Sequence, residues 1–127
     1  MTIDHVGILV PRAQHKEVLN FYLAVLTTLG YKLLTEPVPG VAGMGTEQPD
    51  WWINATDEPN VGIVHVAFGA NERDDVRKFH EAAIAAGAKD NGAPGVRVHY
   101  HPAYYSAFVK DPAGNNLEVV CHSPGSK

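Results

Sequence analysis

The sequence predicts an α+β fold of two βαβββ modules, and a repeated pattern is the reason. A β-branched, apolar run at residues 3–10 has a counterpart at 63–68, and both runs are typical of buried strands. Each run is followed by a helical pattern that ends at a glycine, and then by short extended segments separated by Pro, Gly, Asn and Asp. We therefore expect a single domain over residues 1–127, with modules at 1–57 and 61–123.

In the first module, the strand at 3–10 leads into a helix. Apolar side chains recur at helical spacing from Val18 to Leu29, and Gly30 provides the left-handed residue on which helices commonly end. His15 falls in this helix and is expected at the surface. Three short strands are predicted to follow, at about 31–35, 41–46 and 51–55.

In the second module, the strand at 63–68 leads into a helix that Asn71 is expected to cap. The apolar stripe of this helix ends before Gly87, and the segment 89–95 is expected to be a connecting loop or a cover. The segment 111–115, Asp-Pro-Ala-Gly-Asn, is a strong turn signal between the last two strands. The strands of this half are predicted at 97–100, 104–110 and 116–122.

Composition and charge narrow the function classes. The formal net charge is -4 and the basic residues are scattered singly, which argues against nucleic acid as a partner. The apolar runs are too short and too interrupted to span a membrane, and the N-terminal residues do not resemble a signal peptide. Cys121 is the only cysteine, so no internal disulfide can form. These features favour a cytoplasmic protein.

Two histidines occupy equivalent places in the two repeats. Strand alternation puts His5 on the same face as Gly7, and His65 on the same face as Ala67. The small neighbours leave room beside each imidazole, which indicates a concave surface. Neutral imidazole is a good ligand for zinc, iron and nickel, so the two rings are candidate metal ligands.

Glu118 is the candidate carboxylate for the same ion. It lies in the last predicted strand, in a run that is otherwise apolar up to Cys121. A carboxylate is costly to bury alone, and coordination of a cation would account for it. Taken singly, His5 and His65 are more simply core or surface residues, and Glu118 an outward-facing residue of an antiparallel sheet. The combination of all three favours a metal site.

Three segments together resemble the vicinal oxygen chelate superfamily, which includes glyoxalase I, bleomycin-binding proteins, fosfomycin-resistance proteins and extradiol dioxygenases. These segments are Asp4-His5-Val6-Gly7, His65-Val66-Ala67-Phe68 and the ending from Phe108 to Glu118, with its Asp111-Pro112 and Gly114-Asn115 pairs. The resemblance covers essentially the whole chain, and it implies a cupped, barrel-like mixed sheet with the helices on the outside. It also implies that His5, His65 and Glu118 bind a divalent ion, namely zinc, nickel, manganese or iron.

The resemblance implies a metal-dependent, glyoxalase-like enzyme of lyase, isomerase or dioxygenase type. Such an enzyme chelates a small oxygenated substrate through neighbouring oxygens, and the superfamily often forms homodimers. One departure matters, because glyoxalase I has a fourth, carboxylate ligand on the last strand of its first module. This chain has Trp52 or Asn54 there, or Asp50 if the register shifts. The departure argues against the glyoxalase I reaction and leaves the substrate open.

Polar and aromatic residues of both modules are candidates for roles beside the ion. His101 and Tyr104 are expected to transfer protons. Trp52, Asn54 and Tyr105 are expected to bind the substrate. A simpler interpretation places His101 and Tyr104 at a strand edge that faces water.

Two other functions stay open at this point. The first is a metal-free protein of the bleomycin-resistance type, which binds or sequesters a small molecule against Trp52 without turnover. The presence of all three ligand residues favours the enzyme over this alternative. The second is a degenerate structural member of the superfamily, whose histidines no longer bind an ion.

Overall fold

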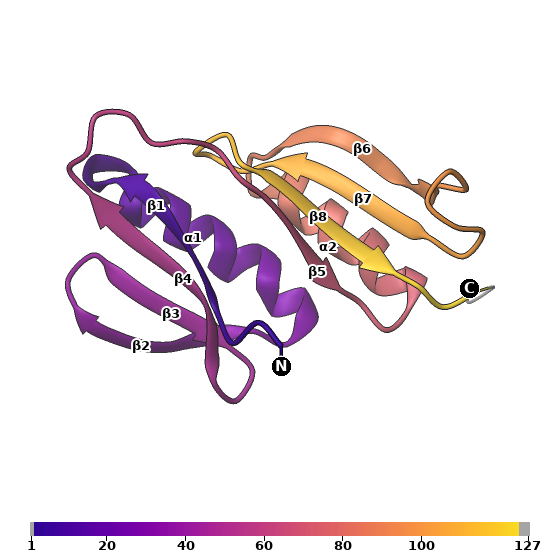
Figure 1. The fold of residues 1–127 in the computed structure, drawn as a ribbon, viewed down its shortest axis with the longest axis horizontal. Coiled ribbons are helices and arrows are strands. Elements are labelled where there is room, and N and C mark those ends of the chain that lie inside the picture. The colour runs from indigo at the N-terminus through magenta and orange to yellow at the C-terminus, as the bar shows by residue number, and fades with distance from the viewer. Residues whose placement is uncertain (1, 125–127) are drawn as a thin grey trace. The chain divides into compact units, whose positions relative to one another are not determined.

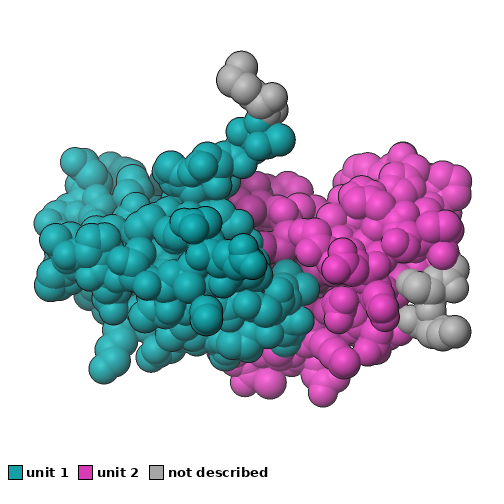
Figure 2. Space-filling view, turned by 90° about the horizontal axis from the view of Figure 1, so that it is seen from below, with its two compact units in different colours: residues 1–62 teal, residues 63–127 magenta. Residues whose placement is uncertain are grey.

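The computed structural model describes residues 2–124. The chain divides into two compact units, residues 1–62 (unit 1) and 63–127 (unit 2), which are coloured separately in Figure 2. Each unit contains a strand, a helix and three further strands in that order (Figure 1). The predicted α+β class with two βαβββ modules is therefore confirmed.

Unit 1 is an open four-stranded mixed sheet with a helix on one face (Figure 1). Its elements are β1 (Val6–Pro11), a 3-10 turn (Arg12–Gln14), α1 (His15–Leu26), a second 3-10 turn (Thr27–Leu29), β2 (Lys32–Val38), β3 (Val41–Gly45) and β4 (Pro49–Thr56). The strand order is β1-β4-β3-β2. Strand β1 runs parallel to β4, and the other neighbouring strands are antiparallel.

The two faces of β1 differ in burial, as the alternation of the sequence predicts. Ile8 and Val10 are buried with the apolar stripe of α1, whereas Gly7 and Leu9 point to the opposite face and are exposed. Gly30 ends the helical segment with a φ of 84°, in the left-handed conformation that its position requires. His5 belongs to the exposed face, one residue before the strand begins.

His15 is a correction to the sequence prediction, because it is buried instead of exposed. It begins α1, and its Nε2 lies 2.8 Å from the carbonyl oxygen of Ile53 in β4. The imidazole therefore joins the start of the helix to the centre of the sheet. Its spacing from Val18 and Leu19 places it on the buried stripe of the helix.

Unit 2 repeats the plan of unit 1 (Figure 1). Its elements are β5 (His65–Gly69), α2 (Arg73–Ala85), β6 (Lys89–Val96), β7 (Tyr105–Lys110) and β8 (Asn116–Cys121). The strand order is β5-β8-β7-β6, and β5 runs parallel to β8. The helix packs its apolar stripe, which includes Phe79, onto the face of the sheet that carries Val119 and Cys121. Within residues 2–124, no helix is long and apolar enough to cross a membrane.

Three local predictions for unit 2 are wrong. The segment 97–100, expected to be a strand, forms a turn, and the segment 89–95, expected to be a connecting loop or a cover, belongs to the strand Lys89–Val96. The glycines and proline of this segment favour a loop, but β6 is an edge strand whose register shifts at Gly92 and Gly95, and an edge tolerates these residues. Asn71 does not cap α2, since the residue before the helix is Glu72, in an extended conformation without a side-chain cap.

The turn at 111–115 fixes the last strand of unit 2 beside the first. Asp111 accepts hydrogen bonds at Oδ1 from the backbone N–H groups of Ala113 and Asn115, at 2.9 and 2.8 Å. Gly114 has a φ of 90°, which the turn requires and which other residues rarely adopt. The Oδ1 of Asn115 accepts from the backbone N–H of Val64 at 2.9 Å, which joins the turn to the start of β5. The turn predicted from the sequence is confirmed.

Candidate metal and ligand sites

Glu118 is the buried carboxylate at the centre of the open sheet face of unit 2. It lies in β8 opposite Ala67 of β5, and only 2% of its surface is exposed. Its Oε1 accepts a hydrogen bond from Nε2 of His65 at 2.8 Å, and its Oε2 accepts one from the hydroxyl of Tyr104. The structure therefore brings together three of the residues selected from the sequence.

The His65 and Glu118 pair has a geometry that a divalent ion can use. Two ligands about 2.0–2.2 Å from one ion lie about 3.4 Å apart in the tetrahedral geometry usual for zinc, and about 3 Å apart at the right angle of an octahedral site. Nε2 of His65 and Oε1 of Glu118 are 2.8 Å apart, so only a small adjustment would separate them around an ion. His65 is half-exposed, which leaves the pair accessible from the open face. The donor set, one imidazole and one carboxylate, fits a transition-metal ion.

Tyr104 is held as a proton donor to the carboxylate. Burial, followed by the hydrogen bond to Glu118, raises the pKa of its hydroxyl to about 12. The phenol therefore remains protonated at neutral pH and can donate to an anion. Its ring packs against Tyr100, His101 and His122, with ring centroids 4.7 to 5.3 Å apart.

In the metal-free protein, Tyr104 is expected to ionise unusually late as the pH rises. The fold stabilises the protonated phenol, so this contribution to stability is complete below about pH 10 and is lost between about pH 10 and 12. In an ultraviolet titration, the parent protein should show a rise in tyrosinate absorbance near pH 12 that the Tyr104→Phe variant lacks. If the part of the absorbance rise that is missing from the variant lies near pH 10 instead, the prediction is contradicted.

His101 forms a pair with His122 instead of facing solvent freely. The Nε2 of His101 lies 2.8 Å from Nδ1 of His122, and the ring centroids are 5.1 Å apart. The Nδ1 of His101 accepts the backbone N–H of Ala103, so the ring proton of uncharged His101 lies on Nε2 and is donated to His122. Both nitrogens of His101 are thus engaged.

His5 lies in unit 1 and is oriented by the residue before it. Its Nδ1 is 2.7 Å from Oδ1 of Asp4, and both side chains are largely exposed, at 58% and 91%; the contact favours the tautomer that carries the proton on Nδ1. The other nitrogen, Nε2, then carries the lone pair that a metal ligand needs. A carboxylate that orients a histidine in this way is typical of metal sites.

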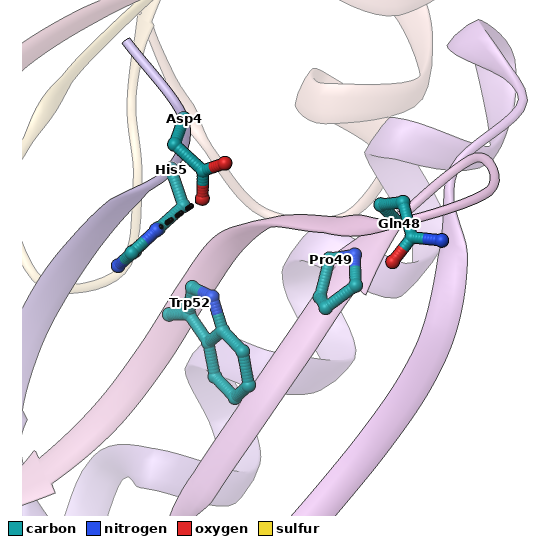
Figure 3. A pocket seen from close by; sticks show the side chains of 5 residues that line it. All are labelled: Asp4, His5, Gln48, Pro49 and Trp52. Carbon is teal, nitrogen blue, oxygen red and sulfur yellow. Dashed lines mark hydrogen bonds and ion pairs between the residues drawn. The ribbon is translucent and has the colours of Figure 1, made fainter.

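Unit 1 also contains a hollow of about 380 Å³ next to His5. Figure 3 shows Trp52 projecting from β4, with Pro49 and Gln48 on one side and the pair of Asp4 and His5 on the other. The register of the sheet places Trp52 opposite Gly7, as it places Glu118 opposite Ala67 in unit 2. Trp52, and not Asn54, therefore occupies the position that is equivalent to Glu118.

Asn54 and Asp50 of unit 1 and Tyr105 of unit 2 have different surroundings. Asn54 shares the face of Trp52, two residues further along β4, and its Oδ1 is buried without a partner among the described residues. The carboxylate of Asp50 accepts a hydrogen bond from Tyr31 at 3.0 Å. Tyr105 lies on the helix-covered face of unit 2, opposite Cys121, with the guanidinium of Arg73 5.0 Å from its ring centre. Alternation thus separates Tyr105 from Glu118.

Each unit, within the residues described, holds one pair that includes a candidate histidine ligand. One pair is His65 with Glu118, and the other is His5 with Asp4. Among residues 2–124, no group of three or more His, Cys, Asp or Glu side chains is assembled to hold an ion. Sequence reasoning did not consider the contact between Asp4 and His5, although the position of Asp4 directly before a candidate ligand was a usable signal.

Comparison with protein families identifies relatives over most of the chain. The model of the Glyoxalase/Bleomycin resistance protein/Dioxygenase superfamily matches residues 2–119. No curated protein matches the sequence.

Solved structures of related proteins share the fold. A glyoxalase/bleomycin resistance protein from Albidiferax ferrireducens T118 is 22% identical over 93% of this chain and 97% of its own, with a TM-score of 0.76. TioX from Micromonospora sp. ML1 is 17% identical over 94% and 98%, with a TM-score of 0.70. Lactoylglutathione lyase from Agrobacterium tumefaciens is 16% identical over 94% and 92%, with a TM-score of 0.69. At these identities the similarity shows a common fold.

Proposed function

This chain belongs to the Glyoxalase/Bleomycin resistance protein/Dioxygenase superfamily, and we propose that it is a metal-dependent enzyme that binds a small oxygenated substrate. The ion, which is zinc, nickel, manganese or iron, is held by His5, His65 and Glu118. The reaction is of lyase, isomerase or dioxygenase type. The observation that carries the proposal is the buried Glu118 carboxylate, with the His65 imidazole 2.8 Å away.

The partners of Glu118 support a site that is built for a cation. The contacts found for its carboxylate are those with His65 and Tyr104, and no Lys or Arg ion pair with it is found among residues 2–124. A carboxylate taken out of water is compensated by hydrogen bonds and, more fully, by a positive charge. A divalent ion at this position supplies that charge, and when bound it acts as a Lewis acid toward a substrate oxygen.

The remaining side chains have roles that follow from their contacts. Tyr104 holds Oε2 of Glu118 and keeps a proton that it can share with a substrate oxygen. His101 holds His122 against the ring of Tyr104, so we assign it a positioning role. Trp52 and Asn54 provide the wall against which the substrate lies. Tyr105 is left out, because it lies on the other face of its sheet.

The proposal requires the two units to contribute to one site. His5 must meet His65 and Glu118 from unit 1 of the same chain or from unit 1 of a partner in a homodimer. The homodimer and a cytoplasmic location stay predictions from the sequence.

Metal analysis of the purified protein tests the proposed function directly. Protein prepared without chelator is expected to contain about one transition-metal ion per chain, to lose it on dialysis against a chelator, and to regain it from a zinc or nickel solution. Binding should raise the melting temperature, because an ion that binds only the folded state stabilises it. Protein that takes up no ion at micromolar concentrations, with unchanged melting temperature, would contradict the proposal.

A metal-free binding protein is the second candidate, and one observation favours it. His65 and Tyr104 together satisfy both oxygens of Glu118 without an ion. In that case the hollow beside Trp52 would hold a small molecule without turnover. Ligand binding by a protein that takes up no ion would distinguish this function from the enzyme.

A further inference from the structure

The residues opposite Trp52 on both neighbouring strands are glycines. Strand β4 places Trp52 between Gly7 of β1 and Gly43 of β3. Neither glycine carries a side chain that could cover the indole on the open face of the sheet. Trp51, in contrast, points to the other face and is buried in the core of unit 1. The chain therefore buries one of its tryptophans in the core and leaves the other half-buried on the open face of the sheet.

Gly43 determines how the indole of Trp52 lies. A Cβ atom at Gly43 would come within 2.8 Å of Cη2 and Cζ3 of the indole, which is closer than real contacts allow. The six-membered ring thus lies directly against the backbone of β3. At Gly7 the nearest atoms to such a Cβ are 3.5 Å away, an ordinary contact. The indole leans toward β3, and space is left on the side of β1 and His5.

That space is the hollow of about 380 Å³ beside Trp52 (Figure 3). Its volume lies at the lower end of the range for small-molecule sites, which is about 300–1,000 Å³. Pro49 and Trp52 give it apolar surface, and Asp4, His5 and Gln48 give it polar groups. A rigid apolar surface beside a few polar groups is the usual make-up of a ligand site.

We infer that this hollow binds a planar aromatic molecule, whose ring lies against the indole of Trp52. The inference takes the proposed small-molecule site as its starting point and adds the class of ligand. An aromatic ring makes face or edge contacts with an indole that a saturated ring of the same size cannot make. The equivalent position of unit 2 carries the Glu118 carboxylate, so the two units offer different chemistry at matching places.

Calorimetric titration with 2-naphthol and with decahydro-2-naphthol, its saturated analogue, tests the inference. The protein is expected to bind 2-naphthol with a dissociation constant of about 1 mM or lower, and the saturated analogue about three- to tenfold more weakly. Trp52→Leu should weaken 2-naphthol at least about tenfold, whereas Trp52→Phe, which keeps a flat ring, should stay within about threefold. Equal binding of the two compounds, or unchanged binding by Trp52→Leu, would overturn the inference.

Gly43→Ala provides a second variant that leaves Trp52 in the chain. The added methyl group displaces the indole, which is the end of a flexible side chain, and avoids the backbone. Its binding of 2-naphthol should fall at least about fivefold, while circular dichroism and melting temperature show that the fold is kept. A folded Gly43→Ala protein that binds 2-naphthol as tightly as the parent would count against the inference.

The titrations are done in a chelator and repeated without one, which separates this inference from the proposed function. If 2-naphthol binds in the presence of the chelator, and the Trp52 variants weaken that binding, the inference is supported, whether or not the protein takes up an ion. If the protein takes up an ion but does not bind 2-naphthol, the inference is overturned and the proposed metal-dependent function is still supported.

Discussion

Replacing Glu118 with glutamine is expected to weaken binding of zinc or nickel by at least about 100-fold, or about 2.8 kcal/mol. The substitution removes the anionic ligand but keeps the length of the side chain and an oxygen that can accept from Tyr104. The fold should therefore persist. Calorimetric titration of metal into the chelator-treated protein measures the change, and circular dichroism confirms that the protein is folded.

Two further variants make the result for Glu118 interpretable. Glu36→Gln removes an exposed carboxylate of β2 and should leave the metal affinity unchanged. Glu118→Ala leaves a cavity and an unpaired Tyr104 hydroxyl, so it should also lower the free energy of unfolding, by about 2–4 kcal/mol. A Glu118→Gln protein with parental metal affinity would show that this carboxylate is structural and that the ion, if one binds, lies elsewhere.

The pair formed by His65 and Glu118 was predictable because local patterns determine it. Alternation in β5 put His65 and Ala67 on one face, and the turn at 111–115 set the start of β8. Once two parallel neighbours are in register, residues on the same face meet. Strand alternation also places Tyr104 and Tyr105 on opposite faces of the sheet. Applied to the start of β7, it would have predicted that Tyr105 lies on the face covered by α2.

Other features depended on contacts that no local pattern reveals. The choice between Trp52 and Asn54 required the register of β1 on β4, which joins segments far apart in the chain. Strand β6 was predicted as a loop because its glycines and Pro94 mask an edge strand, whose pairing tolerates bulges. His15, in contrast, lay on the apolar stripe of its helix, so periodicity was sufficient to predict its burial.

Replacing Trp52 with glutamate is expected to raise the affinity for zinc or nickel by about tenfold to 100-fold. Trp52 lies opposite Gly7, and Glu118 lies opposite Ala67 at the equivalent place in unit 2. A carboxylate at position 52 would therefore have the same position in the register relative to His5 as Glu118 has relative to His65. It would add a fourth protein ligand to the proposed set of three, and structural zinc sites almost always have four protein ligands. The same change removes the indole and should abolish binding of 2-naphthol.

Two matched variants decide whether the gain comes from coordination at that position. Trp52→Gln has the same length as the glutamate variant but lacks its charge, so its metal affinity should stay close to that of the parent. Asn54→Glu puts a carboxylate on the same face, two residues along β4, and should give little gain because it lies opposite Leu9 instead of Gly7. An increase in metal affinity with Asn54→Glu but not with Trp52→Glu would show that position 52 of unit 1 is not equivalent to position 118 of unit 2 with respect to the ion. Equal increases in metal affinity for Trp52→Glu and Asn54→Glu would indicate a general effect of negative charge. A carboxylate that binds the ion directly should raise the affinity at only one of the two positions.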